Sequence, residues 1–188
     1  MKLTVHTDDT APPASRPLLA GIADDLGLVP NMAATIAESP TLLAAFDALR
    51  RAVGAAALDP VLREVAGLAV GVAVDNAYGV AFHSTVLAGM GTAETDLDAM
   101  RGGEPPSDPA AAAVYALARD VVVTRGKVDD AVVDRAVAAG LSTEAVLDVV
   151  AECTFAGLVG TVDNFADRVS LDTFLVPRAW DGGRAAVR

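Results

Sequence analysis

The chain has 188 residues, and its 14 Lys and Arg against 25 Asp and Glu give a net charge of −11 and a pI near 4.4. Such an acidic chain lacks the positive surface that binds phosphate backbones, so we expect no nucleic-acid partner, and anionic lipid surfaces are disfavoured for the same reason. Hydrophobic residues make up 53% of the chain but aromatic residues only 4%. This composition predicts a single helical domain with a core of Ala, Val and Leu.

The mean hydropathy of +0.42 raises the question of a membrane span. The longest apolar runs between charged residues, 65–74 and 153–162, have ten residues each, whereas a spanning helix needs about 20. The first residues, "MKLTVHTDDTAPPAS", lack the apolar core of a signal peptide. We therefore expect a cytoplasmic protein without membrane contact.

Residues 1–15 are polar, aperiodic and contain two prolines, so we predict an N-terminal arm there and a single helical domain over residues 16–188. Three helix starts are marked by a capping side chain followed by proline: Ser39-Pro40, Asp59-Pro60 and Asp108-Pro109. Ser142 is a fourth candidate cap.

The spacing of apolar residues predicts helices over residues 40–54, 60–74, 78–89, 109–125, 129–139 and 143–169, with a short acidic helix after Thr92. No run alternates as a strand does, so the predicted class is all-α, a helical bundle. The end of the chain, "LDTFLVPRAWDGG", is predicted to be a C-terminal docking tail that places Phe174, Leu175 and Trp180 on a surface.

The tripeptide VDN occurs twice, at residues 74–76 and 162–164, each time after an apolar helix. In an Ala/Val/Asp-rich chain such a match arises easily by chance, and it is compatible with two similar helical layers. We expect Asp163 and Asn164 to be solvated polar residues near a helix end.

The stretch "REVAGLAVGVAVDNAYGVAFHSTVLAGMG", residues 63–91, resembles the core motif of the AhpD-like alkylhydroperoxidases within the carboxymuconolactone decarboxylase superfamily. The pattern of that family is Glu, eleven residues, Cys, two residues, Cys, three residues, His. Glu64 and His83 keep this spacing, but Asn76 and Gly79 stand at the two cysteine positions. The resemblance implies an AhpD-like helical bundle that assembles into homo-oligomers such as trimers or hexamers.

In redox members, the resemblance implies, the cysteine pair reduces a hydroperoxide while Glu and His move protons. That chemistry needs a thiolate, and neither Asn76 nor Gly79 supplies one. Cys153, the single cysteine, lies mid-helix among apolar residues, where a thiol is usually buried and inert. One cysteine and two histidines also make an ordinary metal site unexpected, and we expect no metal and no cofactor.

What remains is a set of groups suited to acid/base chemistry. Residues 76, 79 and 83 are spaced to share one stripe of a helix, and Glu64 matches the family position that meets this stripe. We hypothesise cofactor-free lyase, isomerase or decarboxylase chemistry on a small organic substrate, with His83 and Glu64 as the catalytic residues. Asn76, Tyr78 and Gly79 would border the substrate, in the space of the two missing sulfur atoms.

Two alternatives stay open. His83 is explained about equally well as a core histidine that a hydrogen bond to Glu64 satisfies, and Tyr78 as a packing residue, which would fit a catalytically inactive relative that binds a ligand or serves in assembly. An alkylhydroperoxidase is the least favoured alternative, for want of the thiols. The first two readings differ in whether Glu64 and His83 face an open pocket or a sealed core.

Overall fold

The computed structural model describes residues 1–182, and within this range it contains nine α-helices, one short 3₁₀-helix and no strand, which confirms the all-α prediction. The helices are α1 (Arg16–Leu26), α2 (Asn31–Ile36), α3 (Pro40–Gly54), α4 (Pro60–Ala73), α5 (Ala77–Gly89), α6 (Glu94–Arg101), α7 (Pro109–Val123), α8 (Asp130–Ala138), α9 (Thr143–Phe165) and η1 (Thr173–Arg178).

The predicted helix caps are all present. The capping side chains accept hydrogen bonds from the first turns that follow them: Ser39 from the N–H of Leu42, Asp59 from those of Val61 and Leu62, Asp108 from that of Ala111, and Ser142 from that of Ala145. Each such cap stabilises a helix by about 1 kcal/mol. Four helix starts are therefore encoded locally.

Helices α7 and α9 end earlier than the apolar spacing predicts. The residues beyond their ends, Arg125 after α7 and Asp167 and Arg168 after α9, have φ of 58°, 57° and 81°. A right-handed helix cannot include a residue in this left-handed region, so each helix stops before it.

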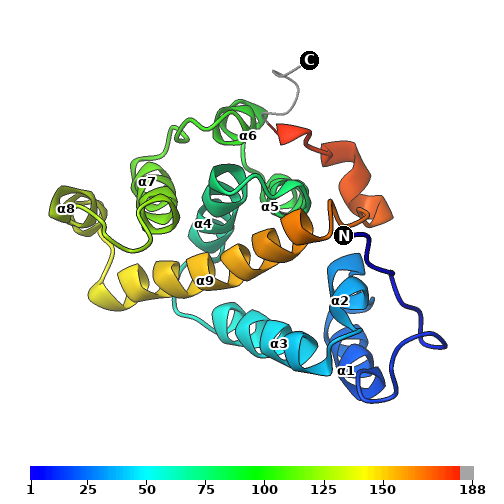
Figure 1. The fold of residues 1–188 in the computed structure, drawn as a ribbon. Helices are drawn as coiled ribbons and strands as arrows, with labels where there is room; N and C mark the ends of the chain where they lie inside the picture. Colours follow the sequence, from blue (N-terminus) through cyan, green and yellow to red (C-terminus); the bar gives the residue numbers. More distant parts are fainter. Residues whose placement is uncertain (183–188) are drawn as a thin grey trace.

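Helix α9 crosses the molecule between two groups of helices (Figure 1). On one side it contacts α4, α5 and α7, and on the other side α2 and α3. Its inward residues belong to two hydrophobic clusters, Cys153 and Ala156 to one, and Val159 and Val162 to the other. The middle of α9 is therefore the place where the two halves of the core meet.

Helix α9 is long and apolar enough to span a membrane, by length and composition alone. The sequence analysis did not predict this, because the uninterrupted apolar run within the helix has only ten residues. The apolar run of α9, residues 153–162, has an acidic residue at each end. These two residues, Glu152 and Asp163, are both buried in this fold. The outer face of α9 is open, with Leu147 62% and Phe165 63% exposed.

Both ends of the described chain lie against the helices. Within residues 1–15 there is no helix. The backbone N–H of His6 donates to the carbonyl of Ala34, and the hydroxyl of Ser15 donates to the carbonyl of Ala37. In the C-terminal segment Leu175 is fully buried beside α5, and the indole of Trp180 donates to the carbonyl of Arg101. The tail thus docks on its own chain, leaving Phe174 44% exposed.

Candidate active site

His83 on α5 and Glu64 on α4 lie together. Nδ1 of His83 is 2.8 Å from Oε2 of Glu64, and both side chains are less than a tenth exposed. Gly67, one turn after Glu64, makes room for the imidazole, because a Cβ there would lie 2.2 Å from Cε1 of His83. The structure therefore brings together the two residues that the sequence singled out for proton transfer.

The two groups favour each other's charged forms. Burial by itself raises the pKa of Glu64, but the hydrogen bond with His83 and the charges of His83 and Arg63 outweigh it, so the pKa lies below its ordinary value. Burial lowers the pKa of His83, and the hydrogen bond and charge of Glu64 more than reverse this shift. The pair is accordingly an ionised carboxylate beside an imidazole that gains a proton readily.

Glu64 also decides which ring nitrogen of His83 is available. Nδ1 is committed to the carboxylate, and among residues 1–182 no group hydrogen-bonds Nε2. A carboxylate that holds one imidazole nitrogen orients the ring and leaves the other nitrogen for proton exchange.

His83 borders a partly enclosed cavity of about 140 Å³ between α3, α5 and α9. Gly79 and His83 form part of its wall, together with Leu26, Pro30, Met32, Phe46, Arg50, Tyr78, Phe82, Phe155, Ala156 and Val159. Glu64 does not line the cavity and contacts His83 from behind. The imidazole is therefore neither exposed to bulk solvent nor sealed in a filled core.

The cavity is apolar, and Arg50, the arginine in its lining, is already neutralised. The guanidinium of Arg50 lies 2.6 Å from a carboxylate oxygen of Asp47 and 2.7 Å from one of Asp25. Phe46 and Phe155, whose ring centroids are 5.4 Å apart, also line the cavity. Such a cavity suits an uncharged ligand with an apolar ring.

Asn76 and Gly79 do not leave the empty space that the loss of two sulfur atoms suggested. Oδ1 of Asn76 accepts the N–H of Gly79 at 2.9 Å and caps α5. A Cβ at Gly79 would lie 2.2 Å from Nδ2 of Asn76, so the amide occupies the place of a side chain at position 79. Gly79 lines the cavity, while Asn76 is buried behind it.

Tyr78 presents its ring to the cavity and its hydroxyl elsewhere. The hydroxyl donates to Oδ2 of Asp172 at 2.6 Å, and burial together with this carboxylate raises the pKa of Tyr78. Asp172 also accepts the N–H of Asn31 at the start of α2. The hydroxyl of Tyr78 therefore links α5 to α2 through Asp172, and its proton is already donated within the protein.

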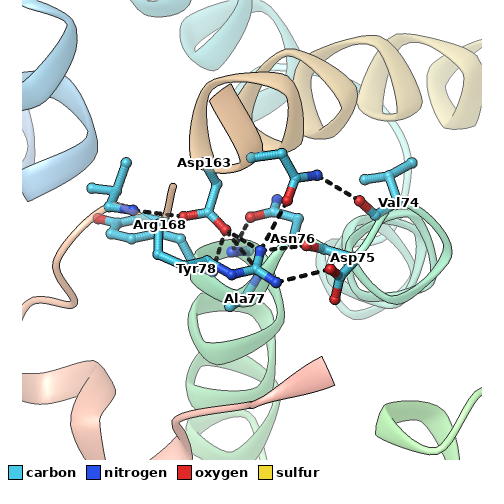
Figure 2. Close-up of polar contacts among 10 residues, drawn as sticks. Val74, Asp75, Asn76, Ala77, Tyr78, Asp163 and Arg168 are labelled. Carbon is cyan, nitrogen blue, oxygen red and sulfur yellow. Dashed lines mark hydrogen bonds and ion pairs between the residues drawn. The ribbon is translucent and has the colours of Figure 1, made fainter. Parts of the chain in front are cut away.

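A carboxylate caps α5 from the neighbouring helix (Figure 2). Asp163 accepts the N–H groups of Ala77 and Tyr78 at 3.0 and 3.4 Å, that of Val169 at 2.8 Å, and an ion pair from Arg168 at 2.9 Å. Its exposure is 0%. The expectation that Asp163 is solvated was wrong, because α9 turns this residue toward the start of α5.

The two VDN tripeptides are joined by a hydrogen bond. The amide of Asn164, which is exposed as expected, donates to the carbonyl of Val74 at 2.7 Å. Arg168 donates both to Asn164 and, at 2.9 Å, to the carboxylate of Asp75. The repeated polar residues thus tie the end of α4 to the end of α9.

Glu152 on α9 is the residue near this site that the sequence analysis did not propose. Its side chain is buried, with 2% exposure, and none of the described residues hydrogen-bonds its carboxyl. Burial is the main reason why the pKa of Glu152 rises to about 7. The charge of His83 lowers this pKa, and the charge of Glu64 raises it further. Its position in the apolar stripe, four and seven residues before Ala156 and Val159, was the available signal.

Cys153 is buried, as predicted, and burial raises the pKa of its thiol to about 12, with a further contribution from the charge of Glu152. A thiol in this state is a poor nucleophile at neutral pH. Among residues 1–182 no cluster of His, Cys, Asp and Glu has an arrangement that could hold a metal ion.

Comparison with known proteins confirms the resemblance drawn from the motif. Residues 40–120 match the model of the carboxymuconolactone decarboxylase family. None of the curated proteins searched matches the chain significantly.

Solved structures share the fold at low sequence identity. An uncharacterised peroxidase-related protein with an alkylhydroperoxidase AhpD core, from Ralstonia eutropha JMP134, superposes with a TM-score of 0.78 at 23% identity over 93% of this chain and 94% of that one. A cysteine-to-alanine variant of the debrominase Bmp8 in complex with 2,3,4-tribromopyrrole gives 0.74 at 18% over 94% of both chains. A peroxidase-related protein from Silicibacter sp. TM1040 gives 0.71 at 15% over 92% and 91%. At these identities the likeness establishes the fold.

Proposed function

We propose that the protein is a cofactor-free acid/base enzyme of the lyase, isomerase or decarboxylase kind, and the match of residues 40–120 to the model of the carboxymuconolactone decarboxylase family is the starting point. His83 is its proton-transferring residue and Glu64 the carboxylate that orients and charges His83. The observation that carries the proposal is that this buried ion pair borders an apolar cavity of about 140 Å³. A histidine kept only for packing needs no cavity beside it.

The size and lining of the cavity indicate the substrate class. A protein cavity of about 150 Å³ lined by apolar side chains holds one benzene molecule, so this one accommodates a single five- or six-membered ring. Its lining offers no unpaired cation for a carboxylate, because Arg50 is bound to two aspartates. We therefore propose a small, uncharged monocyclic substrate, which favours lyase or isomerase chemistry over decarboxylation, because the substrate of a decarboxylase carries a carboxylate. The tribromopyrrole complex of the debrominase Bmp8, a protein of the same fold, supports this choice.

The chemistry follows from the state of the pair. Because Glu64 raises the pKa of His83, the resting enzyme favours an imidazolium whose Nε2–H is an acid. In the forward step this proton moves to the substrate, the neutral imidazole remains hydrogen-bonded to Glu64, and the same nitrogen then accepts a proton from another atom of the substrate or from water. Gly79 and the ring of Tyr78 border the substrate, and the low polarity of the cavity strengthens these electrostatic interactions.

The test is a turnover screen of monocyclic compounds with wild type, His83→Gln and Glu64→Gln. We expect turnover to fall by about 10²-fold or more in each variant, a typical contribution of a positioned acid or base. Glu144→Gln, an exposed change on α9, is the matched control. Turnover that survives both site substitutions contradicts the proposal. Saturable binding without turnover would instead identify an inactive, ligand-binding relative.

A peroxidase assay separates this proposal from the redox alternative. Purified protein with a dithiol donor should reduce organic hydroperoxides no faster than the background, because positions 76 and 79 carry an amide and a glycine and Cys153 is buried. Robust reduction of the hydroperoxide would contradict this reading of the motif.

Self-association is a separate proposal, with the outer face of α9 as the contact surface. The exposed Glu144 lies in the first turn of α9, and from Leu147 to Phe165 the exposed residues are uncharged: Leu147, Val150, Thr154, Thr161, Asn164 and Phe165. In a chain of net charge −11, this is a surface where two copies meet with little repulsion. Sedimentation velocity should show an oligomer that Phe165→Glu dissociates and that Val123→Glu, an equally exposed site on α7, does not. A monomeric wild type would contradict the proposal.

A further inference from the structure

Helix α9 brings a second carboxyl to the His83–Glu64 pair. Glu152 lies on the same face of α9 as Ala156 and Val159, which line the cavity with His83. This face packs on α4 and α5, the helices that carry Glu64 and His83. The three side chains therefore belong to one buried region, although Glu152 is far from both in the sequence.

Glu152 has no structural partner that explains its burial. Its exposure is 2%, and its carboxyl has no hydrogen bond or ion pair within residues 1–182. A buried carboxylate without partners costs several kcal/mol, and glutamine at this position would have nearly the same shape without that cost. The retained carboxyl therefore calls for a role that depends on its ability to gain and lose a proton.

The groups that act on Glu152 come mainly from the proposed active site. Helix α4 contributes Glu64 and Arg63, α5 contributes His83, and no titratable group of α3 or α7 adds to them among the described residues. The interaction is mutual, because the charge of Glu152 favours the protonated form of His83. On its own helix Glu152 also acts on the thiol of Cys153.

We infer that Glu152 is a third member of the acid/base site, a positioning residue whose charge adds to that of Glu64 in holding the proton on His83. The inference rests on the proposed function in assuming that the proton on His83 is the one exchanged with a bound substrate. As the pH rises, Glu152 ionises in the range in which His83 would lose its proton, and the new negative charge holds that proton in place. His83 thus remains an acid over a wider range of pH than Glu64 alone would allow.

The chain offers a direct test, because His6 and His83 are its only histidines. An NMR titration of the imidazole Cε1–H signals of the intact protein gives two curves, and the one absent from His83→Gln belongs to His83. In wild type the curve of His83 should lie above the ordinary pKa and extend over two steps, as for coupled groups. In Glu152→Gln it should become a single step, with a midpoint lower by about half a pH unit or more.

Two further variants complete the design. Glu152→Asp keeps the charge and should restore most of the midpoint, while Glu144→Gln, on the exposed side of the same helix, should leave the curve of wild type unchanged. An unchanged His83 titration in Glu152→Gln, or equal midpoints in the Gln and Asp variants, overturns the inference. So does unfolding of Glu152→Gln in a thermal melt, which would reveal a structural role.

This titration is read without substrate, so its failure leaves the proposed function standing. Conversely, the titration can show coupling between Glu152 and His83 while turnover is unchanged in His83→Gln. That pair of results would refute the proposed function and leave the inference about Glu152 standing.

Discussion

Two buried acids on the inner face of α9, Asp163 and Glu152, lie eleven residues apart and have opposite surroundings. Asp163 accepts three backbone N–H groups and pairs with Arg168. Glu152 has no such partner among the described residues, and its pKa is influenced by the charges of His83 and of another carboxylate, Glu64. The comparison separates a carboxylate that holds the fold together from one whose burial is explained only by chemistry.

The difference arises from which part of α5 each acid meets. Asp163 meets the first turn of α5, where N–H groups lack partners within the helix and the helix dipole favours a negative charge. Glu152 acts on the middle of α5, where the backbone is already hydrogen-bonded within the helix, so its charge is compensated by side chains alone, by that of His83 and more weakly by that of Arg63 on α4. One helix face therefore carries both kinds of buried acid.

The largest expected effect is at the structural acid. Asp163→Ala should lower the free energy of unfolding by about 3 kcal/mol or more, because it leaves N–H groups of α5 and part of Arg168 without an acceptor. Chemical denaturation measures this loss. Asn164→Ala, which removes an exposed hydrogen bond from the next residue, should cost about 1 kcal/mol or less. Equal losses in the two variants would break the comparison.

The next effect is the pH dependence that Glu152 contributes. With its pKa raised from 4.5 to about 7, the folded chain binds more protons than the unfolded chain between these values, so this group makes stability fall as the pH rises. The total loss of stability is about 3 kcal/mol. It begins near pH 4.5 and is complete once the pH has passed about 7. Denaturation at pH 5 and pH 8.5 should show the whole fall in wild type and a smaller one in Glu152→Gln, because the raised pKa of His83 still contributes there. A fall of the same size in the variant would assign it to other groups.

A smaller effect is expected where the family motif has lost its second cysteine. Gly79→Cys should destabilise the fold by about 1 to 3 kcal/mol, because its Cβ meets the amide of Asn76. The double variant with Asn76→Cys removes that amide and should recover part of the loss. The control is Gly157→Cys in α9, where a Cβ would have nothing within 4 Å. Comparable losses at positions 79 and 157 would contradict the steric account.

The smallest effect concerns Cys153, the neighbour of Glu152. In native protein at neutral pH its thiol should react with a disulfide reagent far more slowly than in unfolded protein, because it is buried and its pKa is raised to about 12. Glu152→Gln should change this rate by less than about threefold, since burial, the largest cause of the shift, persists. Labelling of the native chain as fast as that of the unfolded chain would refute the buried state.

Several features of the fold and the candidate site could be predicted because they are encoded within a few residues. The caps at Ser39, Asp59 and Asp108 depend on one side chain and the next turn of backbone. The pairing of Glu64 with His83 was predicted because the chain keeps the spacing of the family motif, although two positions within it have changed.

Other features depend on how distant helices meet. The apolar pattern of α9 marked it as a core helix, but only its contacts with α4 and α5 decide that Glu152 and Asp163 are buried, the first where the charge of His83 acts on it and the second at the start of α5. Likewise, only the packing of α3, α5 and α9 creates the cavity beside His83. By itself the sequence determined the helices and their caps, because hydrogen bonds and apolar periodicity act locally, and its resemblance to the family motif indicated the Glu64–His83 pair. The tertiary structure decided which acids are buried and which are satisfied, because desolvation and charge coupling depend on neighbours far away in the chain.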